Sequence, residues 1–200
     1  MIERMTCAVD QASQKKIVIS DTDFLSGFLW RGEFGIVVKV FAGMGMDIVV
    51  PQAVIDELSY SMRTKTRLAD VLLRLNEKKE KKQGQGEIYI QDIELFSEAG
   101  LKYEELKKTL GKGEAAALSM LYYSDRRFTC LASNNLKDVG DYVRRYGIEL
   151  WTTAEVLDQA VSMDILTENR AEKLWDKMYE DGLYLPTKTF GEYQVQRKAV

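Results

Sequence analysis

Four short blocks rich in acidic or amide side chains stand at regular points along the chain. They read Ser-Asp-Thr-Asp at 20–23, Ile-Asp-Glu-Leu at 55–58, Gly-Lys-Gly-Glu-Ala at 111–115 and Ala-Ser-Asn-Asn at 132–135. Each block follows an apolar run or begins a helical pattern, and in an α/β chain such groups can meet at the carboxyl edge of a parallel sheet. Converging carboxylates repel one another unless a hard divalent cation lies between them. The spacing therefore predicts a Mg²⁺ or Mn²⁺ site and phosphodiester chemistry.

Three acids in these blocks are the candidate ligands, and each also has an ordinary structural explanation. Asp21 directly follows the first apolar run, where an acid can simply cap a helix, although Asp23 is the better cap of the two. Glu57 lies beside apolar residues at helical spacing, where a solvated glutamate is common. Glu114 falls in a first helical turn, where the helix dipole favours any acid. Their shared placement after successive strands, more than any one of them, favours a joint site.

The composition excludes several classes of enzyme. The chain of 200 residues has no histidine, which rules out histidine general bases, Ser-His-Asp triads and histidine-bound zinc. Cys7 and Cys130 are its only cysteines and make no zinc cluster. A formal net charge of −3 gives no overall attraction to nucleic acid, so any such contact must come from local basic patches. Neither a signal peptide nor a membrane span is predicted, and we expect a cytoplasmic protein.

The elements that must position the candidate residues alternate between strands and helices. Apolar runs predict strands at 17–19, 47–50, 87–90, 128–132 and 148–151. Helices are predicted at 22–29, 33–41, from 51 onward, and at 67–82, 114–123, 135–146 and 154–161. This alternation is typical of βαβ units around a parallel sheet.

The chain divides into three parts on this pattern. Residues 1–16 form an N-terminal extension, 17–161 an α/β domain and 162–200 a C-terminal helical appendage. Within the appendage, residues 183–200 have mixed polarity with a proline and a glycine, so we expect them to be only partly ordered.

The four blocks, in this order, resemble the PIN domain family over roughly residues 17–161. The resemblance is carried by Asp-Thr-Asp at 21–23, Pro-x-Ala-Val-x-Asp-Glu-Leu at 51–58, Gly-Lys-Gly-Glu-Ala-Ala-Ala-Leu at 111–118 and the polar pair after the next strand. It implies a three-layer α/β/α fold with a central parallel sheet. PIN domains are metal-dependent ribonucleases, and many bacterial and archaeal members are toxins of toxin–antitoxin pairs. The resemblance therefore implies a Mg²⁺- or Mn²⁺-dependent endonuclease of single-stranded RNA, with an antitoxin protein as partner if it is a toxin.

Carried over position by position, the family's catalytic and metal-binding acids correspond to Asp21, Glu57 and Glu114. The last block differs, because the family usually has Thr-Asp-Asp where this chain has Ser-Asn-Asn at 133–135. Asn134 then takes the place of a catalytic acid, and its carbonyl can ligate Mg²⁺ without adding charge. Ser133 and Thr22 are expected to hydrogen-bond the carboxylates or the phosphate.

Asp138 is a further candidate metal ligand that would compensate for the missing acid. It lies four residues after Asn134 in a predicted helix and so shares its face. The alternative is a surface residue that pairs with Arg144 or Arg145.

Basic side chains near the blocks could position phosphate groups, although each alone is as well explained by solubility. They are Arg63, Lys65, Arg67, Lys112 and Lys137. Another set of side chains gives more apolar surface than two short helices usually need. Together with the resemblance, it predicts a homodimer. The set comprises Trp30, Phe34, Phe41, Met44 and Met46.

Two other functions stay open at this point. The first is a PIN-like module, inactive or weak in catalysis, that binds RNA or a protein, and the asparagine pair favours it. The second is an unrelated Rossmann-like binding protein. That possibility is disfavoured because the chain has neither Gly-x-Gly-x-x-Gly after its first strand nor a Gly-x-x-x-x-Gly-Lys-Ser/Thr loop.

Overall fold

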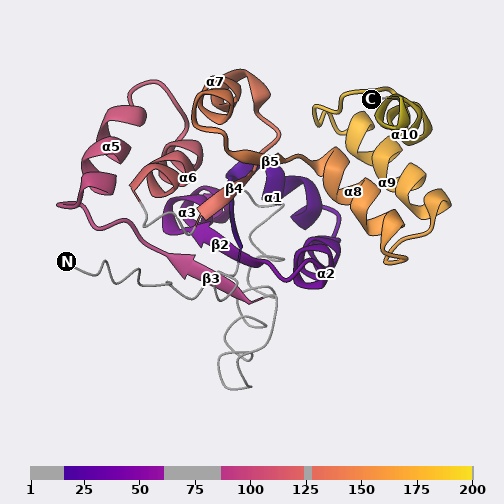
Figure 1. The fold of residues 1–200 in the computed structure, drawn as a ribbon, viewed down its shortest axis with the longest axis horizontal. Helices are drawn as coiled ribbons and strands as arrows, with labels where there is room; N and C mark the ends of the chain where they lie inside the picture. The colour runs from indigo at the N-terminus through magenta and orange to yellow at the C-terminus, as the bar shows by residue number, and fades with distance from the viewer. Residues whose placement is uncertain (1–15, 61–86, 124–127, 200) are drawn as a thin grey trace, which may run out of the picture.

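A sheet of five parallel strands forms the centre of the computed structural model, which describes residues 16–60, 87–123 and 128–199 (Figure 1). The strands are β1 (Ile17–Ser20), β2 (Asp47–Pro51), β3 (Ile88–Gln91), β4 (Phe128–Ala132) and β5 (Glu149–Trp151), in the order β3-β2-β1-β4-β5. The chain builds outward from β1 to β3 and then crosses to the other side of β1. This reversal of strand order lies between β1 and β4, and open α/β sheets place their crevices at the carboxyl ends of such strands.

Side chains of the strands alternate between two cores, one on each face of the sheet. Val18, Ile48 and Val50 belong to the larger core, whereas Ile19 and Val49 belong to the smaller one. The larger core includes α1 (Thr22–Leu29), α2 (Phe34–Gly43), α3 (Gln52–Tyr60), α8 (Thr153–Ser162), α9 (Glu168–Glu180) and α10 (Phe190–Lys198). The smaller includes α5 (Glu98–Leu106), α6 (Lys112–Tyr123) and α7 (Leu136–Tyr146). The three-layer α/β/α fold with a central parallel sheet is therefore confirmed.

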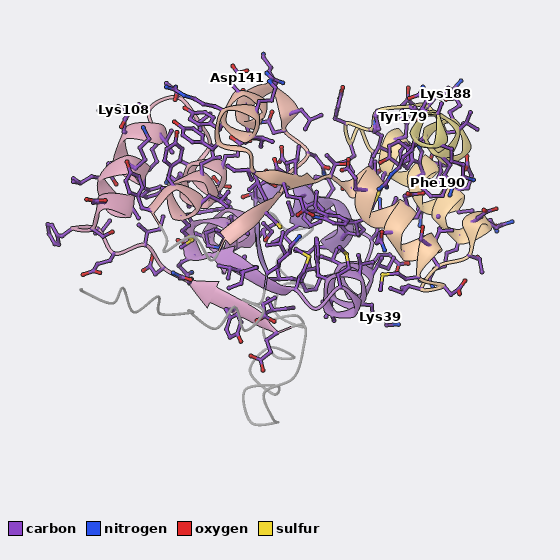
Figure 2. The ribbon with its side chains drawn as sticks, viewed as in Figure 1. Lys39, Lys108, Asp141, Tyr179, Lys188 and Phe190 are labelled. Atoms are coloured by element: carbon purple, nitrogen blue, oxygen red, sulfur yellow. The ribbon has the colours of Figure 1, made fainter. Side chains whose placement is uncertain are left out.

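The C-terminal helices share the larger core with the sheet. Trp175 of α9 and Phe190 of α10 are buried, with ring centroids 5.5 Å apart, in the same cluster as Phe24 of α1. Figure 2 shows Phe190 among these helices, which lie beside α1 and α2 in Figure 1. Residues 190–198 form a regular helix that begins at a capping box of Thr189 and Glu192, which corrects our expectation of partial order.

Three of the five apolar residues in and around α2 that predicted a homodimer are buried within the chain. Phe34 and Phe41 of α2, which packs against α8, are buried, and Met46 beyond the end of α2 is buried in the same core. Phe41 also meets Trp151 at the end of β5 edge-on, at 5.5 Å between ring centroids. The apolar excess thus covers the chain's own core, and the homodimer stays a prediction from the resemblance alone.

Two of the predictions made from the sequence about helices differ from the structure or lie outside its described residues. The α5 helix was not predicted, because it buries only Gly100 and Leu106 and shows no apolar stripe. The helix predicted at 67–82 and the N-terminal extension up to residue 15 lie outside the described residues. Within the described ranges, no helix is both long and apolar enough to cross a membrane.

Candidate active site

Asp21 lies directly after β1 and is completely buried. Its Oδ1 atom accepts a hydrogen bond from the Phe24 N–H (2.9 Å) and caps α1, whereas its Oδ2 atom is buried without a hydrogen-bond partner among the described residues. The expectation that Asp23 is the cap was wrong. Asp21 has the extended backbone of a cap residue, while Asp23 is already inside the first turn.

Burial has a large effect on the Asp21 carboxyl. It raises the pKa of Asp21 to about 7, against the lowering effects of the Ser133 hydroxyl and the Phe24 amide. Asp23 and Glu114 raise this pKa further by charge repulsion. Asp21 is therefore a carboxyl that would lose its proton readily on the arrival of positive charge.

Glu57 is held at the site by two donors from other elements. Its Oε1 atom accepts from the Gly113 N–H (3.2 Å) at the start of α6, and its Oε2 atom accepts from the Thr22 hydroxyl of α1. The contact with α6 requires glycine at position 113, because a Cβ atom there would lie 2.8 Å from Glu57 Oε2 and would also clash with Thr22. The second glycine of the Gly-Lys-Gly-Glu block thus lets α6 approach Glu57.

A single amide joins Glu114 to Asp138. The Oε2 atom of Glu114 accepts from the Gly111 N–H (3.1 Å), and its Oε1 atom accepts from the Asn135 side-chain amide (2.5 Å). The same amide donates to Asp138 Oδ2 (2.7 Å), while the Asn135 side-chain oxygen caps α7 by accepting from the Asp138 N–H (3.3 Å). Asp138 thus lies next to Glu114, linked to it through Asn135, and Arg144, one of its two alternative partners, pairs with Asp141.

Asn134, the predicted fourth ligand, is turned to a different partner. Its side-chain oxygen accepts from the Thr153 N–H and its amide donates to the Thr153 hydroxyl, both at 2.9 Å. These two bonds tie the end of β4 to the start of α8. The amide in contact with the acids is that of the next residue, Asn135, which sequence reasoning missed. Its place just before a helical pattern, typical of an N-cap, was the available signal.

The carboxylates of the site repel one another. Partial loss of hydration raises the pKa of Asp23, although this side chain reaches solvent, and Glu57 and Asp138 raise it further. Burial also raises the pKa of Glu114; Asn135 and Gly111 oppose this, and Asp138 and Asp23 add to it. Five acids (Asp21, Asp23, Glu57, Glu114 and Asp138) thus form one network of like charges at the carboxyl edge of the sheet.

A comparison with family models matches residues 17–198 to the PIN domain. The chain belongs to the PIN domain family. The match covers the whole α/β region and continues through α9 and α10. PIN domains are generally nucleases that bind RNA, and they typically use divalent metals. A search of curated proteins gave no match.

The donor chemistry of this PIN domain fits a divalent cation. Carboxylate oxygens are the ligands that Mg²⁺ and Mn²⁺ prefer, and Asp21 Oδ2 is a buried oxygen without a hydrogen-bond partner among the described residues. As the side chains stand, no three acidic, cysteine or histidine residues in the described ranges are grouped closely enough to form a metal shell. Side chains such as Glu114 and Asp138 would have to draw together around a cation.

Two hollows flank the acids of the PIN domain. One, of about 770 Å³, lies between α1, the start of α7 and the segment after α9, and Asp23, Asn135 and Lys137 are part of its lining. The other, of about 590 Å³, is lined by Glu57, Lys112 and neighbours on α3 and α5. Lys112 and Lys137, two of the predicted phosphate-positioning residues, thus line two different hollows, each of which also includes an acid of this group. The other three, at positions 63, 65 and 67, lie outside the described residues.

Proposed function

We propose that this PIN domain is a Mg²⁺- or Mn²⁺-dependent endonuclease that cleaves single-stranded RNA. The supporting observation is a network of five acids linked by charge repulsion, one of which is Asp21 with its buried, unpartnered Oδ2 atom. Such crowding disfavours the charged forms of the acids unless a cation neutralises them. The network lies where the strand order reverses, which is the usual place for a site in this class of fold.

Asp21, Glu57, Glu114 and Asp138 would hold the cation in this proposal. Asn135 takes the place that we predicted for Asn134, because its amide donates to Glu114 and Asp138, whereas Asn134 is turned to Thr153. A bound divalent cation supplies a water of lowered pKa and neutralises charge on the phosphodiester.

The remaining side chains position these groups and the strand. The Thr22 hydroxyl and the Gly113 N–H fix the Glu57 carboxylate, so its oxygens need little reorganisation. Lys112 and Lys137, in the two hollows, would contact phosphates on either side of the cleaved bond.

Cleavage of a labelled single-stranded RNA, with Mg²⁺ or Mn²⁺ and with a chelator, tests this function. We expect Asp21→Asn and Glu57→Gln to abolish cleavage and to weaken Mn²⁺ binding in calorimetry. The matched control is Asp141→Asn, because Asp141 lies on α7, three residues after Asp138, with a side chain that is 88% exposed (Figure 2). Equal cleavage by wild type and Glu57→Gln would refute the assignment, and equal cleavage of duplex RNA would refute the single-strand preference.

We also infer that the nuclease acts as the toxin of a toxin–antitoxin pair, an inference that rests on the family resemblance. Induced expression should arrest growth, and Glu57→Gln should relieve the arrest. Unimpaired growth on expression of a cleavage-competent wild type would contradict a toxin role.

A binding module without hydrolytic activity is the second candidate. It is favoured by the Asn135 amide, which already bridges Glu114 and Asp138 and so stabilises this pair without a cation. This candidate predicts RNA binding in chelator, no cleavage with either metal, and a gain of cleavage in Asn135→Asp.

A further inference from the structure

The chain turns sharply after α9, and a Schellman motif fixes the turn. Gly182 has a φ of 82°, its N–H donates to the Tyr179 carbonyl (3.0 Å), and the Leu183 N–H donates to the Met178 carbonyl (2.9 Å). This double hydrogen bond with a left-handed glycine is a defined way of ending a helix. The direction in which residues 183 and 184 leave α9 is therefore set by the backbone.

The turn is fastened to α1, the helix that Asp21 caps. Arg31, whose side chain is only 5% exposed, donates to the Gly27 carbonyl (2.7 Å), the Lys177 carbonyl (3.1 Å) and Asp181 (2.5 Å). Leu183 packs on Gly27, where an added Cβ atom would lie 3.3 Å from it. The segment 181–184 is thus a fixed wall beside the site.

This wall closes one side of the hollow of about 770 Å³, a size within the range of small-ligand sites. The lining of the hollow includes Asp23 and Asn135, the residue that bridges Glu114 and Asp138. The lining also includes a cation, Lys137, and four apolar or aromatic side chains, which are Trp30, Leu136, Leu183 and Tyr184. Tyr184 directly follows the turn and is 66% exposed. An aromatic ring presented in this way, next to a lysine, suits a nucleobase and its phosphate.

We propose that this hollow is a nucleotide subsite in which Tyr184 stacks on a base of the single-stranded RNA next to the acids, while Lys137 contacts a phosphate. This proposal deepens the proposed function and rests on it for the identity of the ligand. Only an unpaired base can offer its face to the ring, since the bases of a duplex are stacked on one another. Stacking is tolerant of base identity, so the subsite favours single strands over duplexes more than it selects a sequence.

The test is equilibrium binding of a fluorescein-labelled single-stranded RNA in EDTA, so that cleavage plays no part. We expect Tyr184→Ala to weaken binding about 5- to 150-fold, as found for the loss of one stacked base, and Tyr184→Phe to keep wild-type affinity. The matched control is Tyr179→Ala, which removes a 47% exposed tyrosine of α9 outside the hollow (Figure 2) and should leave the affinity unchanged. Thermal melting of each variant verifies that it folds.

Equal affinities of Tyr184→Ala and Tyr179→Ala would overturn the subsite, and so would an equal loss of duplex and single-stranded RNA binding. In the cleaving enzyme, Tyr184→Ala should raise KM with little change in kcat. The two proposals fail separately in these assays. If no metal-dependent cleavage is seen but Tyr184→Ala binds RNA more weakly, the nuclease proposal is refuted and the subsite proposal stands. If cleavage is metal-dependent but Kd and KM are unchanged in Tyr184→Ala, only the subsite proposal is refuted.

Discussion

Asp21→Asn gives a quantitative test of the buried carboxyl. Burial raises the pKa of Asp21 from its usual 3.8 to about 7 in the metal-free protein. Between these two values the folded protein keeps a proton that the unfolded chain has lost. The folded state binds more protons, so its stability falls as the pH rises through this window. At 1.36 kcal/mol per pKa unit, Asp21 costs the folded state about 4 kcal/mol above about pH 7 compared with below about pH 4.

An asparagine cannot titrate, so the variant should lack this part of the pH dependence. The free energy of unfolding of Asp21→Asn, minus that of wild type, should increase by about 4 kcal/mol between about pH 4 and about pH 8. If the asparagine amide itself destabilises the fold, that free-energy cost is the same at both pH values and cancels in the difference. The measurement is urea denaturation in EDTA over that range.

The control and the metal arm make the test specific. Asp141→Asn, at an 88% exposed carboxylate, should give a profile parallel to that of wild type. Mn²⁺ at one hundred times its Kd should stabilise wild type by about 2.7 kcal/mol at about pH 8, and Asp21→Asn by less. Parallel profiles of wild type and Asp21→Asn in EDTA would refute the reasoning, because the carboxyl would then not be desolvated as its position indicates.

Three other predictions concern different parts of the molecule. Gly113→Ala should lower stability by about 1–3 kcal/mol and abolish any cleavage, because the new Cβ atom displaces Glu57; chemical denaturation and the RNA assay measure both effects. Asn134→Asp should destabilise the protein by about 1–3 kcal/mol without tightening Mn²⁺ binding, whereas Asn135→Asp should tighten it about tenfold or more, as calorimetry would show. The chain should sediment as a homodimer at micromolar concentration, and a monomeric mass throughout that range contradicts the dimer.

The sheet and its acids could be predicted because their signals are local. Runs such as residues 17–19 are apolar at successive positions, as a strand covered on both faces requires. The acids follow breaks that mark element ends, including the glycines before Glu114 and the proline before the helix of Glu57. Placing them at one edge needed only the rule that parallel strands end together.

The parts that could not be predicted depend on distant contacts. Asn134 and Asn135 are identical neighbours, and only Thr153, nineteen residues beyond Asn134, decides which of them is engaged elsewhere. The burial of Phe41 depends likewise on Trp151, which no local pattern reveals. The wall at residues 181–184 arises from a helix end that meets α1 through Arg31, so no catalytic motif marks it.

The place of β1 in the sheet has a consequence for how the protein is made. This strand is synthesised early, yet it pairs on one side with β4, and the Asp21 N–H donates to the Ala132 carbonyl (3.0 Å) from the far half of the chain. Pairing between such distant segments is slow, because a long loop must close first. A nascent chain that has not yet released β4 from the ribosome has only the part of the site that follows β1 and β2. The acids therefore come together only late in translation, and a prematurely terminated chain carries Asp21 and Glu57 but no assembled site.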